Sequence, residues 1–313
     1  MTSLLAKPII LLALSVMLVS AGYSFYHHDR PRIDAQAYDF IGWNLARGLG
    51  YIEDEHNAGN PRADDAIVRV GPGYQFFLAG VYKVFGHHVW IVWLLHAILR
   101  GATVYLIYAL TLFLFREDAD NRTRKECAAL LAAVLVGFSP DLIVINGLLL
   151  TETLFLFLLV SAVYSALHLV SYDAGTMRLR SLGTSFLWAC AVLTRPVALF
   201  PLMATIIALA FQRRWRDSAL MALVPLLLVG SWSYAMTRRY DHFVLTTTAG
   251  WYDMWVGNNS EATGGFEKSP AIQQFRDVTY DSTVLDKVGR EKYFEFLFSH
   301  PLQFLELQWR KTA

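Results

Sequence analysis

Long apolar runs separated by short charged gaps constrain this chain more than any other feature. A helix needs about 20 apolar residues to cross the roughly 30 Å hydrocarbon core of a bilayer, and several runs reach that length. The whole sequence is 55% hydrophobic and only 17% charged, which is too apolar for an ordinary soluble domain. We therefore expect an all-α polytopic membrane protein.

The pattern predicts about seven transmembrane helices. The stretch 182–211 is too long for one crossing, and Pro196 cannot continue a helical hydrogen-bond ladder, so we expect two short spans with a turn at Arg195. The first run has an alternative interpretation as a cleaved signal peptide, because Val19-Ser20-Ala21 offers small residues at a cleavage point. The expected spans are residues 8–26, 89–115, 127–145, 148–170, the two halves of 182–211, and 219–236.

Basic residues in short loops predict the orientation. They gather in three segments, which share one side only if the stretch 182–211 crosses twice, and that side is then the cytoplasm. The loop 27–88 and the tail 238–313 fall on the outer side. The chain thus divides into a transmembrane module, 1–237, with interfacial helices in its long first outer loop, and an outer C-terminal segment, 238–313. The basic residues are Arg116, Arg122, Arg124 and Lys125; Arg178 and Arg180; and Arg213, Arg214 and Arg216.

Charge and repeats argue against two classes of protein. The formal net charge is +1, from 27 basic and 26 acidic residues, and there is no basic stripe of the kind that nucleic acid requires. No period of 20 to 50 residues and no matching halves are visible, which weakens an inverted-repeat transporter interpretation. We expect a membrane protein that does not bind nucleic acid.

The first outer loop is longer than a connector needs to be and is rich in carboxylates. We interpret residues 53–55 and 64–65 as solvated surface, because runs of charge mostly face water. Asp34 differs because it follows the first membrane exit directly. A carboxylate there can accept a proton from a substrate or hold a divalent metal such as Mg or Mn.

Six short motifs occur in a fixed order along the chain. They resemble the pattern of GT-C membrane glycosyltransferases, which use polyprenyl-phosphate sugars and include bacterial protein mannosyltransferase-like and lipid A aminoarabinose transferase-like groups. In the second motif, two residues separate the arginine from Pro-Gly-Tyr, which departs from the family's Arg-Pro-Pro-Gly-Tyr run. The motifs are Asp34-Ala-Gln-Ala-Tyr38 continuing to Gly48-Leu-Gly50-Tyr51; Arg69-Val-Gly-Pro72-Gly73-Tyr74; Leu150-Thr151-Glu152; Leu193-Thr194-Arg195-Pro196; Gly257-Asn258-Asn259; and His300-Pro301.

The resemblance implies roles for individual residues. Asp34 matches the catalytic first-loop aspartate, as general base or metal ligand, and Glu152 matches a second acidic position. Arg69 matches a basic residue near the lipid phosphate. The motifs also make Tyr38, Tyr74 and Asn258 candidate substrate-binding residues.

The reaction expected from the resemblance moves a sugar from a lipid-linked donor to a glycan, lipid or protein acceptor on the periplasmic face of a bacterial inner membrane. Such a donor carries its own leaving group, so the protein must mainly bind a phosphate and orient or deprotonate an acceptor. Arginine suits phosphate through its bidentate fork. Arg195, Arg238 and Arg239 also fall on the outer side and join Arg69 as candidate phosphate ligands.

Two alternatives remain open from the sequence. A transporter or flippase of a lipid-linked or polar solute would use charged residues inside spans, for which His96 and Arg100 are the candidates. A structural hydrogen bond or ion pair between helices is the competing interpretation of those two residues. Relatives of this type generally continue with more spans after the point where Ala313 stands, so an inactive, truncated homologue is the second alternative. The adjacent histidines His27-His28 and His87-His88 are expected to be interfacial rather than metal ligands.

Overall fold

A computed structural model describes residues 6–69, 71–116, 122–171, 178–265, 269–278 and 281–312, and every regular element in these ranges is a helix. Four of these helices are long and apolar enough to cross a membrane. A fifth candidate span is a pair of helices, α5 (Arg122–Gly137) and α6 (Pro140–Gly147), bent by 47° at the break between them. The four are α1 (Ala6–His27), α4 (Val89–Leu114), α7 (Glu152–Ser171) and α10 (Trp215–Tyr240).

The stretch expected to cross twice forms two shorter apolar helices. α8 (Arg178–Thr194) ends just before Arg195, and α9 (Leu199–Phe211) begins after a single turn of 3-10 helix at Pro196–Ala198. The break predicted from the Thr-Arg-Pro sequence is therefore confirmed. By length and composition the described residues support four or five spans, so the fold is that of a helical membrane protein, and the count of seven stays a prediction.

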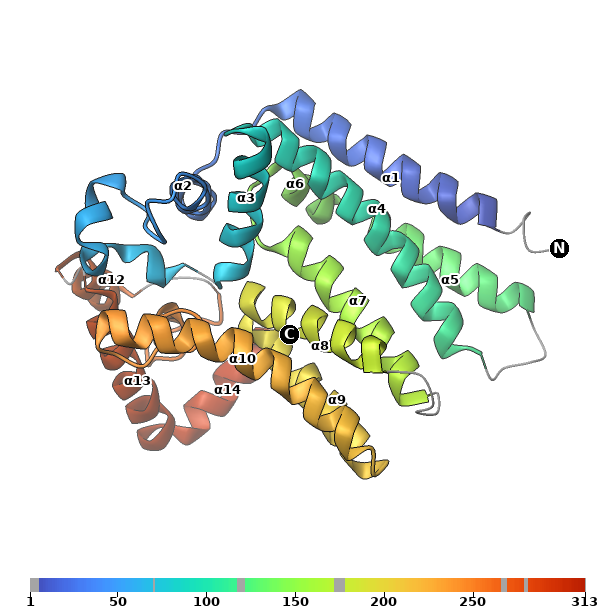
Figure 1. Cartoon of the computed structure of the whole chain (residues 1–313). Coiled ribbons are helices and arrows are strands. Elements are labelled where there is room, and N and C mark those ends of the chain that lie inside the picture. Colours follow the sequence, from blue (N-terminus) through green and yellow to red (C-terminus); the bar gives the residue numbers. More distant parts are fainter. Residues whose placement is uncertain are drawn as a thin grey trace.

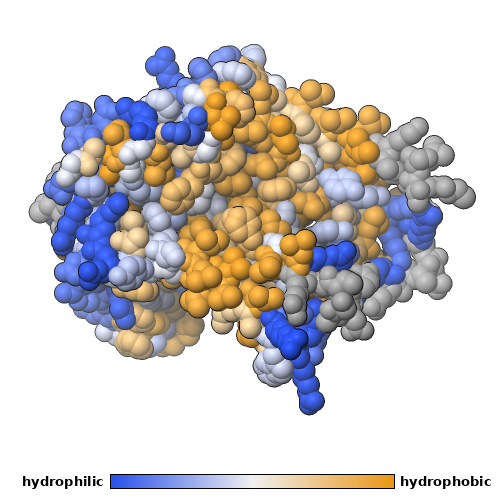
Figure 2. Space-filling model, in the orientation of Figure 1, coloured by the Kyte–Doolittle hydropathy of each residue, from blue (hydrophilic) through white to orange (hydrophobic). Residues whose placement is uncertain are grey.

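Hydrophobic and polar surfaces separate along the molecule. Figure 1 places the ends of α4, α7 and α9 and the starts of α5, α8 and α10 away from the other end of the molecule. The three basic segments lie at these helix ends, and the other end holds α2 (Asp34–Ala46), α3 (Pro72–Phe85), α12 (Pro270–Val278) and α13 (Ser282–Ser299). Hydrophobic residues cover the middle of the same view, and hydrophilic ones gather over the end with α2, α12 and α13 (Figure 2). The basic segments and the long first loop thus lie at opposite ends of the bundle, as their sequence pattern predicted.

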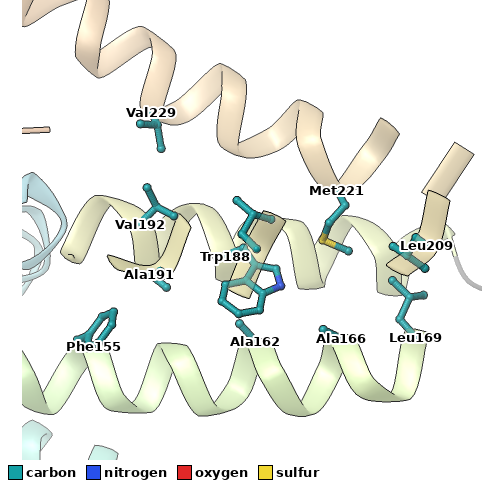
Figure 3. Packing of buried hydrophobic residues seen from close by; sticks show 12 residues of the cluster. Phe155, Ala162, Ala166, Leu169, Trp188, Ala191, Val192, Leu209, Met221 and Val229 are labelled. Atoms are coloured by element: carbon teal, nitrogen blue, oxygen red, sulfur yellow. The ribbon is translucent and has the colours of Figure 1, made fainter. Parts of the chain in front are cut away.

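Small residues let α7, α8 and α10 approach one another closely (Figure 3). Trp188 of α8 is buried at the centre, where Ala162 and Ala166 of α7 make room for its ring, and Met221 of α10 lies on the other side. Without a hydrophobic driving force in lipid, such helices associate through close van der Waals packing, which small side chains permit. Phe155 ends this cluster near the start of α7 and so connects the core with the site described below.

The polar end is built from helices that the sequence partly predicted. The helices expected in the long first loop are α2 and α3, which pack so closely that a Cβ on Gly42 would lie 2.6 Å from that of Leu78. Between α2 and α3 the loop forms three short 3-10 turns, Glu55–Gly59, Pro61–Ala63 and Asp65–Val68. The C-terminal segment 238–313 contains α11 (Ala249–Gly257), α12, α13 and α14 (Pro301–Thr312).

Candidate functional site

Asp34, Arg69 and Glu53 form a charged triad in the long loop 27–88. Arg69 donates from Nε and Nη2 to the two carboxylate oxygens of Glu53, at 3.0 and 3.1 Å, and from Nη1 to Asp34 Oδ1 at 2.9 Å. The Asp34 side chain is 56% exposed, whereas those of Arg69 and Glu53 are 22% and 27% exposed. The predicted catalytic aspartate therefore sits at the open edge of a partly buried ion-pair network.

Local backbone chemistry fixes the members of this triad. Asp34 opens α2 and follows Ile33, whose positive φ of 51° turns the chain sharply out of the preceding segment. Asp64 holds the backbone at Glu53, because its carboxylate accepts hydrogen bonds from the amides of Glu53, Asp54 and Ala66 at 2.7, 2.9 and 2.9 Å. Sequence reasoning placed both Glu53 and Asp64 on a solvated surface. Their partners are distant in sequence, so only the folded loop reveals these roles.

A second pair joins Glu152 and Arg195. Glu152 begins α7 and accepts a hydrogen bond from Arg195 Nη1 at 2.7 Å. The guanidinium carbon of Arg195 also lies 5.8 Å from the ring centre of Phe155, within range of a cation–π contact. Both side chains of the ion pair are about one third exposed, at 34% and 36%. This ion pair shows that the turn at Arg195 lies beside the start of α7. The order of the motifs in the sequence did not predict that contact.

Two glycines bring the triad and the pair together. A Cβ on Gly71, whose φ is +39°, would lie 2.2 Å from the carbonyl oxygen of Leu193, and one on Gly73 would lie 2.8 Å from the amide nitrogen of Thr194. Only glycine permits this contact between the turn after Arg69 and the end of α8 just before Arg195. The Gly-Pro-Gly turn and the Thr-Arg-Pro break are therefore two sides of one junction.

Tyr38 lies within electrostatic range of the four predicted charges. It is a buried residue of α2, and its ring meets that of Tyr74 edge-on with centroids 5.7 Å apart. Burial raises the pKa of the Tyr38 phenol, and the charges of Asp34 and Glu152 raise it further, while Arg69 and Arg195 act in the opposite direction. All four charges are thus close enough to influence one hydroxyl, which stays protonated and able to donate a hydrogen bond.

The charge balance of the triad keeps its arginine ionised. Burial opposes the charged form of Arg69, but the hydrogen bonds and negative charge of Glu53, together with Asp34, outweigh this and raise the arginine's pKa. Three carboxylates and two guanidiniums meet in this region when Glu152 and Arg195 are included. The site is therefore polar, at one end of an apolar bundle.

The other predicted arginines lie outside this site. Arg239 donates to the carbonyl oxygen of Tyr51 at 3.3 Å and so supports the first loop from the end of α10. Arg238 is exposed in the last turn of α10 and makes no hydrogen bond or ion pair within the described ranges. The sequence grouped four arginines by side of the membrane, and the structure brings only Arg69 and Arg195 together.

Two of the predicted substrate-binding residues serve the fold in this structure. Tyr74 is fully buried, with its hydroxyl 3.2 Å from His96 Nε2. Asn258 is also buried, and its Oδ1 accepts hydrogen bonds from Gln308 and Lys311 of α14, each at 2.7 Å. Neither side chain faces an open surface, whereas Tyr38 lies within the charged cluster. A substrate role for Tyr74 or Asn258 stays a prediction that their placement does not favour.

The charged residues inside the spans bond to neighbouring helices. His96 Nδ1 lies 3.2 Å from the carbonyl oxygen of Asn146, and Arg100 Nη2 donates to the carbonyl of Gly137 at 2.6 Å. That carbonyl ends α5, so Arg100 places a cation at the negative end of a helix dipole. The interpretation of these residues as interhelical hydrogen-bonding groups is confirmed.

The role of Asp34 as ligand of a divalent metal ion stays a prediction. Within the ranges that the structure describes, no group of three or more His, Cys, Asp or Glu could hold one. Asp34 and Glu53 meet through the guanidinium of Arg69, so a cation already occupies the space between the two carboxylates. His87 instead pairs with Asp39 at 2.8 Å and stacks on Trp43, which accounts for it structurally.

Comparison with known proteins gives no relative: no protein-family model matches this chain, and no curated protein or solved structure matches it. The residues and their geometry therefore carry the functional argument by themselves.

Proposed function

We propose that the chain is a membrane glycosyltransferase that moves a sugar from a polyprenyl-phosphate donor to an acceptor on the outer face of the membrane. The observation that carries this proposal is the meeting of Asp34, Glu53 and Arg69 with Glu152 and Arg195 around Tyr38. Partly exposed acids and arginines at the end of an apolar bundle suit a substrate with a lipid tail and a charged head.

The chemistry requires few parts from the protein. A phosphate-linked sugar brings its own leaving group, so the protein must bind that phosphate and take a proton from the acceptor hydroxyl. Asp34 is the most exposed member of the triad, and its Oδ2 makes no hydrogen bond within the described ranges. We assign it the role of general base. Glu152 is the second carboxylate, and it orients Arg195 through their ion pair.

Arg195 is the better phosphate ligand of the two site arginines. Arg69 commits three of its nitrogens to carboxylates, whereas Arg195 commits only Nη1. Arg195 is also more exposed and lies at a backbone break, where a ligand can approach without opening a helix. A donor phosphate would exchange with Glu152 or share the guanidinium fork with it.

The finer parts of the proposal rest on the sequence pattern. These parts are a GT-C-like arrangement with seven crossings, a bacterial inner-membrane location and a periplasmic site. The acceptor class, whether glycan, lipid or protein, depends on pocket shape and is left open by the proposal. The transporter alternative would rely on His96 and Arg100, whose hydrogen bonds to backbone carbonyls give them a structural task instead.

One preparation can separate the enzyme from the alternatives. The purified protein is supplied with polyprenyl-phosphate sugars and a membrane extract as acceptor, and radiolabelled product is counted. The same protein in liposomes is tested for flux of the donor lipid and of free sugars. Transfer without flux supports the proposal. Flux without transfer supports a transporter. A folded protein that shows neither flux nor transfer supports an inactive homologue.

A further inference from the structure

We propose that Glu53 is a positioning residue that keeps Arg69 from closing on the proposed base. This inference rests on the proposed function, because it assigns Glu53 a task in the same site. Glu53 receives two parallel hydrogen bonds from Arg69, and Asp34 receives one. Arg69 therefore binds Glu53 through two parallel N–H groups and binds Asp34, the proposed base, through a single N–H.

The geometry matters because arginine binds a carboxylate best through two parallel hydrogen bonds. If Glu53 were absent, the fork of Arg69 would be free to turn toward Asp34 and engage both carboxylate oxygens. In the structure Arg69 engages only Oδ1 of Asp34, at 2.9 Å, and leaves Oδ2 for an acceptor hydroxyl. Glu53 thereby keeps a lone pair of the base available while Arg69 still supplies a stabilising charge.

The loop is built to hold Glu53 in this place. Asp64 is buried, and its two oxygens accept the amides of Glu53 and Asp54 at 2.7 and 2.9 Å. It also accepts from Asn57 Nδ2 at 3.1 Å, which closes the loop on itself. A carboxylate that was merely solvated would not need a second carboxylate to organise its backbone. The neighbouring Glu55 shows the contrast, since its partner is Arg47 in a different part of the loop.

The test measures sugar transfer by the full chain carrying Glu53→Gln, with Glu55→Gln as the matched control. Both changes replace a glutamate paired with an arginine in the same loop. We expect Glu53→Gln to lower kcat about tenfold or more, with KM for the lipid donor within about twofold of the parent, because the base is misoriented while donor binding persists. Glu55→Gln should keep the parental kcat.

A second comparison separates positioning from a general loss of structure. In an Arg69→Ala background, Glu53→Gln should lower kcat by no more than about twofold, because Glu53 acts only through Arg69. If Glu53→Gln does not fold, Arg69→Lys serves in its place: a lysine keeps the charge but lacks the fork, so kcat should again fall about tenfold.

The outcomes distinguish this inference from the proposed function. A parent that transfers no sugar from any polyprenyl-phosphate donor overturns both. If the parent is active and its Glu53→Gln variant keeps full kcat, the positioning role alone is overturned. The same holds if Glu53→Gln lowers kcat by the same factor in the parent and in the Arg69→Ala background. If Arg69→Lys is the variant measured, a parental kcat overturns the role as well.

Discussion

The polar groups inside the helical bundle and those at its open end have different hydrogen-bond partners. Inside the bundle, His96 and Arg100 are buried and bond to the backbone carbonyls of Asn146 and Gly137. At the open end, Arg69 and Arg195 are partly exposed and bond to side-chain carboxylates from distant segments. Both regions contain histidine or arginine on an apolar scaffold, but their partners differ.

The difference indicates which charges are available to a ligand. A backbone carbonyl cannot move away without breaking a helix end, so the polar groups of the bundle are fixed parts of the fold. A carboxylate on a side chain can rotate or exchange its partner when a phosphate arrives. Partly exposed pairs between side chains are therefore the better candidates for chemistry, and buried bonds to the backbone are the better candidates for stability.

The largest effect is expected from Asp34→Asn. The amide keeps the size of the side chain but cannot accept a proton, so sugar transfer should fall about 100- to 10,000-fold in a normally folded protein. Asp29→Asn, a matched change at an exposed position of the same loop, should leave the rate near that of the parent. Rates of transfer measured on both purified variants check this, and full activity of Asp34→Asn would remove the proposed mechanism.

A smaller loss is expected when the exchangeable arginine is removed. Arg195→Ala should raise KM for the lipid donor and reduce kcat/KM about 10- to 100-fold, because hydrogen bonds to a charged group contribute about 1.5–3 kcal/mol. Arg238→Ala removes an exposed arginine outside the site and should change kcat/KM less than about twofold. Donor titrations on both variants give the comparison. The reverse ranking would move the phosphate site to the end of α10.

The junction between the triad and the pair is expected to tolerate no side chain. Gly73→Ala puts a Cβ 2.8 Å from the amide nitrogen of Thr194, and overpacking of this kind costs about 1–3 kcal/mol of stability. Gly80→Ala lies on the same helix with open space around its Cβ and should stabilise the protein by about 0.5–1 kcal/mol. Melting temperatures in detergent should therefore shift in opposite directions. A shift in the same direction would argue against the close contact of α3 with α8.

The smallest effect is expected inside the bundle. Asn146 Nδ2 donates to Ser24 Oγ at 2.9 Å and to the carbonyl of Ser20 at 3.3 Å, which ties α6 to α1. Asn146→Leu should lower stability by about 1 kcal/mol, the usual size of a polar side-chain contact between membrane helices, and leave transfer per folded molecule unchanged. Thermal unfolding and activity of one preparation measure both. A large activity loss without destabilisation would contradict the division between the two regions.

Much of the architecture could be predicted because it depends on local signals. Apolar runs predicted the long helices, and Thr194-Arg195-Pro196 predicted the break between α8 and α9. The number of crossings is less certain from sequence, because α8 and α9 are apolar yet short. Length alone does not tell whether such a pair spans a bilayer.

The site was only partly predictable because its contacts join distant segments. Asp34 and Glu152 stand out by their positions at helix starts next to apolar runs. Glu53 does not, since its partner Arg69 is 16 residues away and the surrounding acidic run is typical of solvated surface. Arg238 and Arg239 are adjacent in sequence, yet only Arg239 reaches the first loop. Such differences depend on side-chain direction, which a single sequence does not encode locally.

The central claim is that the two acid–arginine groups form one site for a lipid-borne phosphate. An experimental structure with a polyprenyl-phosphate analogue tests it most directly. We predict the phosphate within hydrogen-bonding distance of Arg195, with Asp34 beside the group that the sugar would occupy and Arg69 still held by Glu53. Phosphate density beside Arg238, or within the bundle next to Arg100, would contradict the claim.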